Sequence, residues 1–105
     1  MDTMDVKAYL PLFIEETKDN IQQMSENLLS LEQNPDDENA INEIFRAMHT
    51  IKGMAATMGY AGISDLAHEA ENLLDKVRQN QVQVSSNMIN GFFEVVDEFE
   101  AQLVA

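Results

Sequence analysis

Hydrophobic residues recur along the chain at intervals of three, four and seven, which is the spacing of one face of an α-helix. The first such stretch covers about residues 7–33, where the apolar positions run from Leu10 to Leu31. Pro11 falls near its first turn, where a missing backbone N–H costs little. The segment 34–37, Asn-Pro-Asp-Asp, then ends the helix and forms a turn. The pattern therefore predicts one long amphipathic helix.

The same spacing continues in the rest of the chain. It predicts three more helices, at about residues 37–58, 64–80 and 86–104. Gly59 stands where a left-handed cap is usual, Ser64 is expected to cap the third helix, and Ser85 or Ser86 the fourth. No segment alternates every two residues, so no sheet is expected. We predict a single all-α domain over residues 1–105, an antiparallel up-down-up-down four-helix bundle.

Composition narrows the possible functions. The chain has 105 residues, which suit one small domain and leave no room for an ATP-binding kinase module. Its 19 acidic and 6 basic residues give a net charge of -13, which opposes binding to nucleic acid or an anionic membrane surface. It has no cysteine, which excludes disulfides and cysteine nucleophiles. An acidic N-terminus and the lack of an apolar run of about 18 residues predict a cytoplasmic protein that does not insert into membranes.

The reactive groups are few, and His49 stands out among them. A helical wheel places it roughly 140° from the apolar stripe of its helix, so the ring faces outward. Gly53 lies one turn further on, although glycine inside a helix costs about 1 kcal/mol relative to alanine. A missing side chain there leaves one ring nitrogen open to a bulky partner. Lys52 can reach an anion placed on that nitrogen.

The second histidine, His68, lies almost opposite the apolar stripe of the third predicted helix. Glu71 is within about one turn of it on the polar side. A carboxylate beside an imidazole fixes its tautomer and raises its basicity. Whether His68 and Glu71 meet His49 across the helix boundary stays open at this point.

Each of these residues also has a plain structural interpretation. An outward histidine on a helix is most often an ordinary surface residue, and Gly53 could serve close packing of two helices. We expect no metal site. The two histidines lie on different helices, and neither a His-Glu-x-x-His motif nor the Glu-x-x-His pairs of di-iron bundles occur.

Two segments resemble a known family. Residues 49–59, His-Thr-Ile-Lys-Gly-Met-Ala-Ala-Thr-Met-Gly, resemble the signature of histidine phosphotransfer (HPt) domains: His, a small hydroxyl residue, an aliphatic residue, then Lys-Gly. Residues 66–75, Leu-Ala-His-Glu-Ala-Glu-Asn-Leu-Leu-Asp, are similar to the H-x-x-E-N-x-L-D segment of one subfamily. That subfamily is the N-terminal phosphoacceptor domain of CheA-type chemotaxis histidine kinases. The likeness covers nearly the whole chain, and Ala56, where many relatives have glycine, is a mild departure.

The resemblance implies a phosphorelay through His49. In the family this histidine is phosphorylated on Nε2, in trans, by the ATP-binding domain of the same dimeric kinase, and the phosphoryl group passes to an aspartate of a response regulator of the CheY or CheB type. By the same resemblance, Glu71 would hold the Nδ1–H of His49, with His68 and Lys52 completing a hydrogen-bonded network. ATP and Mg²⁺ would come from the kinase domain, and Mg²⁺ also from the regulator. The domain alone would then bind no cofactor and would be a relay rather than an enzyme.

Two alternatives stay open. A stand-alone phosphotransfer protein of a multistep relay would use the same chemistry. Residues 66–75, and a last helix that reaches Ala105 without a clear stop, favour instead an N-terminal fragment of a longer kinase. A non-catalytic helical interaction module would leave Lys52 and Gly53 beside an exposed His49 as coincidence.

Overall fold

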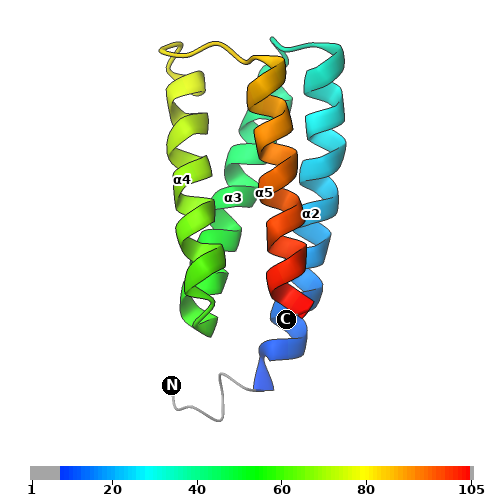
Figure 1. The fold of residues 1–105 in the computed structure, drawn as a ribbon, viewed down its shortest axis with the longest axis vertical. Coiled ribbons are helices and arrows are strands. Elements are labelled where there is room, and N and C mark those ends of the chain that lie inside the picture. The colour runs from blue at the N-terminus through cyan, green and yellow to red at the C-terminus, as the bar shows by residue number, and fades with distance from the viewer. Residues whose placement is uncertain (1–7, 105) are drawn as a thin grey trace.

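The computed structural model describes residues 8–104, which form four long α-helices lying side by side (Figure 1). The helices are α2 (Leu10–Gln33), α3 (Glu38–Met58), α4 (Ala61–Arg78) and α5 (Ser86–Val104). Helix α3 packs against α2 and α4, and α5 packs against the same two helices. No strand occurs among the described residues. The predicted all-α bundle is confirmed; the start predicted at residue 7 lies outside the described residues.

The local sequence explains where α2 ends and where α3 begins and ends. Pro11 occupies the first turn of α2, and Asn34 ends that helix in an extended conformation. The carboxylate of Asp37 caps α3 by accepting a hydrogen bond from the backbone N–H of Ala40 at 3.1 Å. Gly59 ends α3 with a φ of 80°, which glycine adopts without strain. These boundaries agree with the sequence pattern to within a residue.

The third helix differs from its prediction at both ends. Helix α4 begins at Ala61, three residues before the predicted start at Ser64, and it ends at Arg78 instead of residue 80. Tyr60 takes the N-cap position without a side-chain hydrogen bond. Because the left-handed turn at Gly59 reverses the chain at once, the next helix starts earlier than a serine cap would place it. Ser64 is therefore not a cap.

The apolar stripes of the four helices meet in one core. Its most deeply buried large side chains are Phe99, Met24, Leu28, Leu31, Ile44, Met48, Ile51, Ile63 and Leu74. On α4 the small residues Ala67 and Ala70 are buried. Leu66 and Leu73, which the helical spacing of the sequence also assigns to the apolar stripe, are half-buried at the edge of the core. The leucines therefore place the predicted apolar face of α4 slightly to one side of the face that is actually buried.

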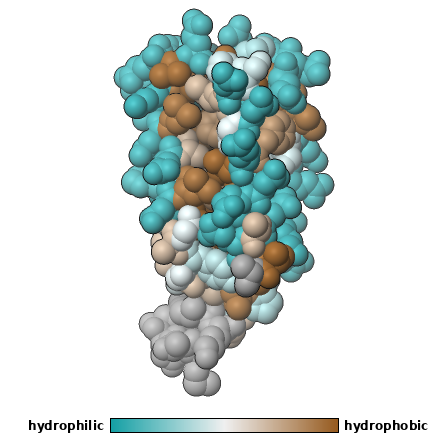
Figure 2. Space-filling model, in the orientation of Figure 1, coloured by the Kyte–Doolittle hydropathy of each residue, from teal (hydrophilic) through white to brown (hydrophobic). Residues whose placement is uncertain are grey.

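Hydrophilic side chains cover much of the face shown in Figure 2, with smaller hydrophobic patches between them. The exposed large hydrophobic side chains include Leu12 and Leu29, each on α2, and Val104 at the end of α5. Among residues 8–104, no helix combines the length and the apolar character that crossing a membrane requires.

Thr17 is the buried polar side chain of the described core. It is fully buried on α2, and its hydroxyl has no hydrogen-bond partner within residues 8–104. A buried hydroxyl without a partner costs about 1–3 kcal/mol, and valine has nearly the same shape without the hydroxyl. We expect Thr17→Val to raise the free energy of unfolding by about 1 kcal/mol, measured by urea denaturation. The control Thr17→Ser keeps the hydroxyl and loses a methyl group, so it should be less stable than the parent. A lower urea midpoint for Thr17→Val contradicts the prediction.

Candidate functional site

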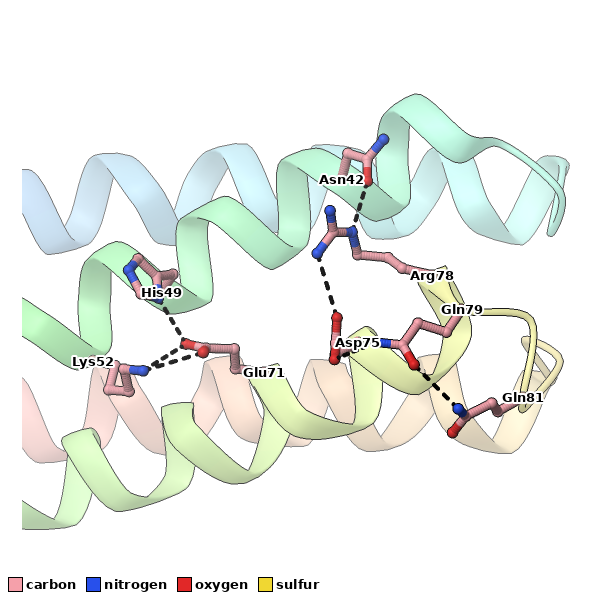
Figure 3. A network of polar contacts seen from close by, with 8 residues as sticks. All are labelled: Asn42, His49, Lys52, Glu71, Asp75, Arg78, Gln79 and Gln81. Atoms are coloured by element: carbon pink, nitrogen blue, oxygen red, sulfur yellow. Dashed lines mark hydrogen bonds and ion pairs between the residues drawn. The ribbon is translucent and has the colours of Figure 1, made fainter.

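Three of the predicted site residues come together where α3 packs against α4 (Figure 3). His49 and Lys52 lie on α3, and Glu71 lies on α4. The Nδ1 atom of His49 is 3.1 Å from Oε2 of Glu71, and Nζ of Lys52 donates a hydrogen bond to the same carboxylate at 3.1 Å. Glu71 therefore contacts His49 across the two helices, which the sequence alone left undecided.

The exposure of the three side chains differs. The side chain of His49 is 65% exposed, whereas those of Lys52 and Glu71 are 28% and 14% exposed. The carboxylate therefore lies at the base of the site, and the imidazole projects beyond it. Among residues 8–104, no hydrogen bond occupies Nε2 of His49. This nitrogen is free to meet a group arriving from another molecule.

The charge on Glu71 determines how the imidazole is held. Burial raises the pKa of the Glu71 carboxyl, but hydrogen bonds from Lys52 and His49, and the charges of these two groups, outweigh it. The net pKa lies below the usual 4.5, so Glu71 is ionised at neutral pH. An ionised carboxylate accepts the Nδ1–H of a neutral imidazole, which leaves the lone pair on Nε2. The arrangement thus prepares Nε2 as a nucleophile.

His68 is the fourth residue of the predicted network. It is exposed on α4, and among residues 8–104 its ring forms no hydrogen bond with His49, Lys52 or Glu71. The prediction that it completes the network stays a prediction.

Gly53 is exposed one turn after His49 on α3. Among residues 8–104, a Cβ atom placed there meets nothing within 4 Å. The interpretation that Gly53 serves close packing of the described helices is therefore wrong, because none of them approaches this position. The open space beside the imidazole agrees with a role in access to His49.

The same open space gives a prediction about stability. We expect Gly53→Ala to raise the free energy of unfolding by about 1 kcal/mol, because alanine is the better helix former and its methyl group meets no neighbour. Urea denaturation measures the change, with the exposed Ala56→Gly on the same helix as the reverse control, expected to lower stability by a similar amount. A destabilised Gly53→Ala would show that the site is not open.

A second polar cluster, which was not predicted from the sequence, lies further along the interface between α3 and α4 (Figure 3). Nε of Arg78 donates to Oδ1 of Asn42 at 3.0 Å, and its Nη1 is 3.5 Å from Oδ1 of Asp75. The guanidinium carbon lies 4.2 Å from the ring centroid of Phe45, a cation–π distance. The seven-residue interval between Glu71 and Arg78 was the available signal, since it places both on one side of α4.

Comparisons with known proteins agree with this geometry. The family model described as "Hpt domain" matches residues 8–104. The chemotaxis protein CheA of Bacillus subtilis (strain 168) is 43% identical over 100 residues, which cover 95% of this chain and 15% of that protein. The CheA phosphotransferase domain from Thermotoga maritima is similar in structure, with a TM-score of 0.88 and 41% identity over 98% of this chain and 95% of that one.

A further solved structure contains a partner protein. It holds the phosphorylated P1 domain of CheA3 in complex with CheY6 from R. sphaeroides. It is similar to this chain with a TM-score of 0.85 and 25% identity, covering 91% of this chain and 75% of that one. The chain spans about 15% of the length of the first curated relatives it matches.

Proposed function

Since the chain belongs to the histidine phosphotransfer (Hpt) domain family, as its sequence resemblance indicated, we propose that it is the phosphoacceptor domain of a chemotaxis histidine kinase. In this proposal His49 receives a phosphoryl group from an ATP-bound kinase domain and passes it to an aspartate of a response regulator. The observation that carries the proposal is the exposed imidazole of His49, held through Nδ1 by an ionised Glu71 and open at Nε2. We place the domain in the cytoplasm, as part of a longer kinase.

The first step is attack by Nε2 of His49 on the γ-phosphorus of ATP. A P–N bond forms, the bond from that phosphorus to the bridging oxygen breaks, and ADP leaves. The imidazole gains positive charge as it attacks, and the Glu71 carboxylate at Nδ1 stabilises that charge. Lys52, held near the site by Glu71, offsets part of the negative charge of the incoming phosphoryl group.

The second step reverses the roles. A carboxylate oxygen of the regulator attacks the phosphorus, the P–N bond breaks, and the electron pair returns to Nε2 of His49. The solved complex of a phosphorylated P1 domain with CheY6 supports a CheY-type regulator as the partner, and we extend the proposal to CheB-type regulators. A relay through the full kinase is favoured over a stand-alone phosphotransfer protein, because the CheA of Bacillus subtilis, a whole chemotaxis protein, is 43% identical to this chain.

The remaining chemical groups are proposed to come from the partners. The kinase domain of the same dimer would supply ATP and Mg²⁺ in trans, and the regulator would supply Mg²⁺ for the second transfer. The domain itself supplies the nucleophile and the residues that orient it. We therefore expect the isolated chain to be a substrate and relay without turnover of its own.

The test is a labelling experiment with the isolated chain. The chain is incubated with γ-labelled ATP, Mg²⁺ and the catalytic core of a CheA-type kinase. We expect label that is stable in base and labile in acid, as a phosphorylated histidine is, and transfer of that label to an added CheY-type regulator. A kinase core that labels its own phosphoacceptor domain but leaves this chain unlabelled would overturn the proposal.

A further inference from the structure

Helix α4 reaches α3 through three hydrogen-bonding residues spaced seven apart: Ser64, Glu71 and Arg78. Seven residues are about two helical turns, so the three side chains form one row along α4. Glu71 is the middle member and contacts His49. The outer two bond to α3 on either side of that contact. We call these three residues the α4 row.

The partners on α3 follow in reverse order, as antiparallel helices require. The hydroxyl of Ser64 donates to the backbone carbonyl of Lys52 at 3.2 Å. Arg78 donates from Nε to Asn42 at 3.0 Å. Lys52 follows His49 in the sequence and Asn42 precedes it, so the two outer bonds bracket the site. Together they oppose sliding and rotation of α4 against α3.

The two outer bonds are suited to this task. The acceptor of Ser64 is a backbone carbonyl, which moves only with its helix, and the bond is partly buried. The guanidinium of Arg78 contacts Asn42 and the ring of Phe45 on α3, as well as Asp75 on α4. One side chain is thus tied to both helices.

The register of α4 matters because the contact at the site is short. A slide by one residue moves a helical Cα by about 1.5 Å along the axis. A shift of that size lengthens the 3.1 Å contact between Nδ1 of His49 and Oε2 of Glu71 and changes its angle, which weakens the hydrogen bond. The flexible Glu71 side chain needs its backbone held in place to keep this geometry.

We propose that Ser64 and Arg78 are positioning residues that fix the register of α4 on α3 and so keep the Glu71 carboxylate on Nδ1 of His49. Neutral imidazole exchanges between two tautomers, and only the one protonated on Nδ1 carries its lone pair on Nε2. The consequence for phosphorylation rests on the proposed function, whereas the consequence for the tautomer does not.

The first test compares single variants in the labelling assay. We expect Ser64→Ala to slow phosphorylation about threefold, the size set by the loss of one partly buried hydrogen bond. Ser64→Thr keeps the hydroxyl and should restore the rate. Arg78→Lys keeps the charge and loses the Nε bond, so it should act like Ser64→Ala. The matched control is Ser30→Ala on α2, which removes a serine bond to a carbonyl of the same helix and should change nothing.

The second test separates positioning from a general loss of stability. If Ser64 acts through Glu71, it has no effect once the acceptor at position 71 is removed, so the double variant Ser64→Ala/Glu71→Ala is no slower than Glu71→Ala alone. An equal threefold loss in both backgrounds would overturn the proposal.

The third test needs no phosphorylation. ¹⁵N NMR of the His49 ring at alkaline pH should show a larger Nε2-protonated fraction in Ser64→Ala and in Arg78→Lys than in the parent. An unchanged tautomer ratio in both variants rejects the positioning role, even if the parent is phosphorylated. A parent that accepts no phosphoryl group rejects the proposed function and leaves the tautomer result standing on its own.

Discussion

Replacing His49 by glutamine is expected to abolish phosphorylation of the chain. Glutamine can donate a hydrogen bond to Glu71, but its amide nitrogen has no free lone pair and cannot attack phosphorus. Removing a covalent nucleophile costs at least about 1,000-fold in rate. The side chain of His49 is 65% exposed and outside the core, so we expect the fold to survive and the free energy of unfolding to change by less than about 1 kcal/mol.

The measurement is acid-labile label in the kinase-core assay, followed by peptide mapping of the labelled site. The matched control is His68→Gln, because His68 is the other of the two histidines in the chain and is also exposed. It should retain label on His49. Label kept by His49→Gln, or label that maps to His68 in the parent, would move the acceptor away from His49.

The positions of the four helices were largely predictable from the sequence, because their stripes repeat over many turns. Helices α3 and α5 begin and end within a residue of the predicted bounds. The start of α4 was missed because Ser64 is a good cap in isolation, yet its hydroxyl bonds to Lys52 on another helix. In the folded chain the Ser64 hydroxyl makes this contact with α3 instead of capping α4, which a local preference for serine at the N-cap does not reveal.

The site was predictable in part. The outward direction of His49 follows from its own helix, and Lys52 and Gly53 are its neighbours on that helix. The contact between His49 and Glu71 depends on the register of α4 against α3, which one helix cannot reveal. Without the family resemblance, the sequence did not distinguish Glu71 from the other carboxylates of α4 as the partner of His49. The contacts of Arg78 escaped prediction for the same reason.

Glu71→Gln is expected to slow phosphorylation of His49 at least about tenfold, comparable to the loss of a carboxylate that orients a histidine in a metal site. Glutamine has the same shape and still accepts the Nδ1–H of His49. It lacks the charge that stabilises the ring during attack and that holds Lys52. The control is Glu69→Gln, which removes one exposed negative charge from the same helix. A rate unchanged in Glu71→Gln, or lowered equally in Glu69→Gln, would remove Glu71 from the mechanism.

The pH dependence of stability gives the same variant an independent test. The pKa of Glu71 is lowered in the folded protein, where burial that raises it is outweighed by hydrogen bonds and charges from Lys52 and His49. A lowered carboxyl pKa stabilises the fold fully above the unfolded value, near 4.5, and this contribution is lost as pH falls through the lower folded value. Glu71→Gln should therefore be less stable than the parent at neutral pH, and the gap in urea midpoint should narrow once the pH drops below about 4.5. A gap that stays constant into acid would mean that the lost stability came from packing, and that the carboxylate charge does not hold His49 and Lys52 in place.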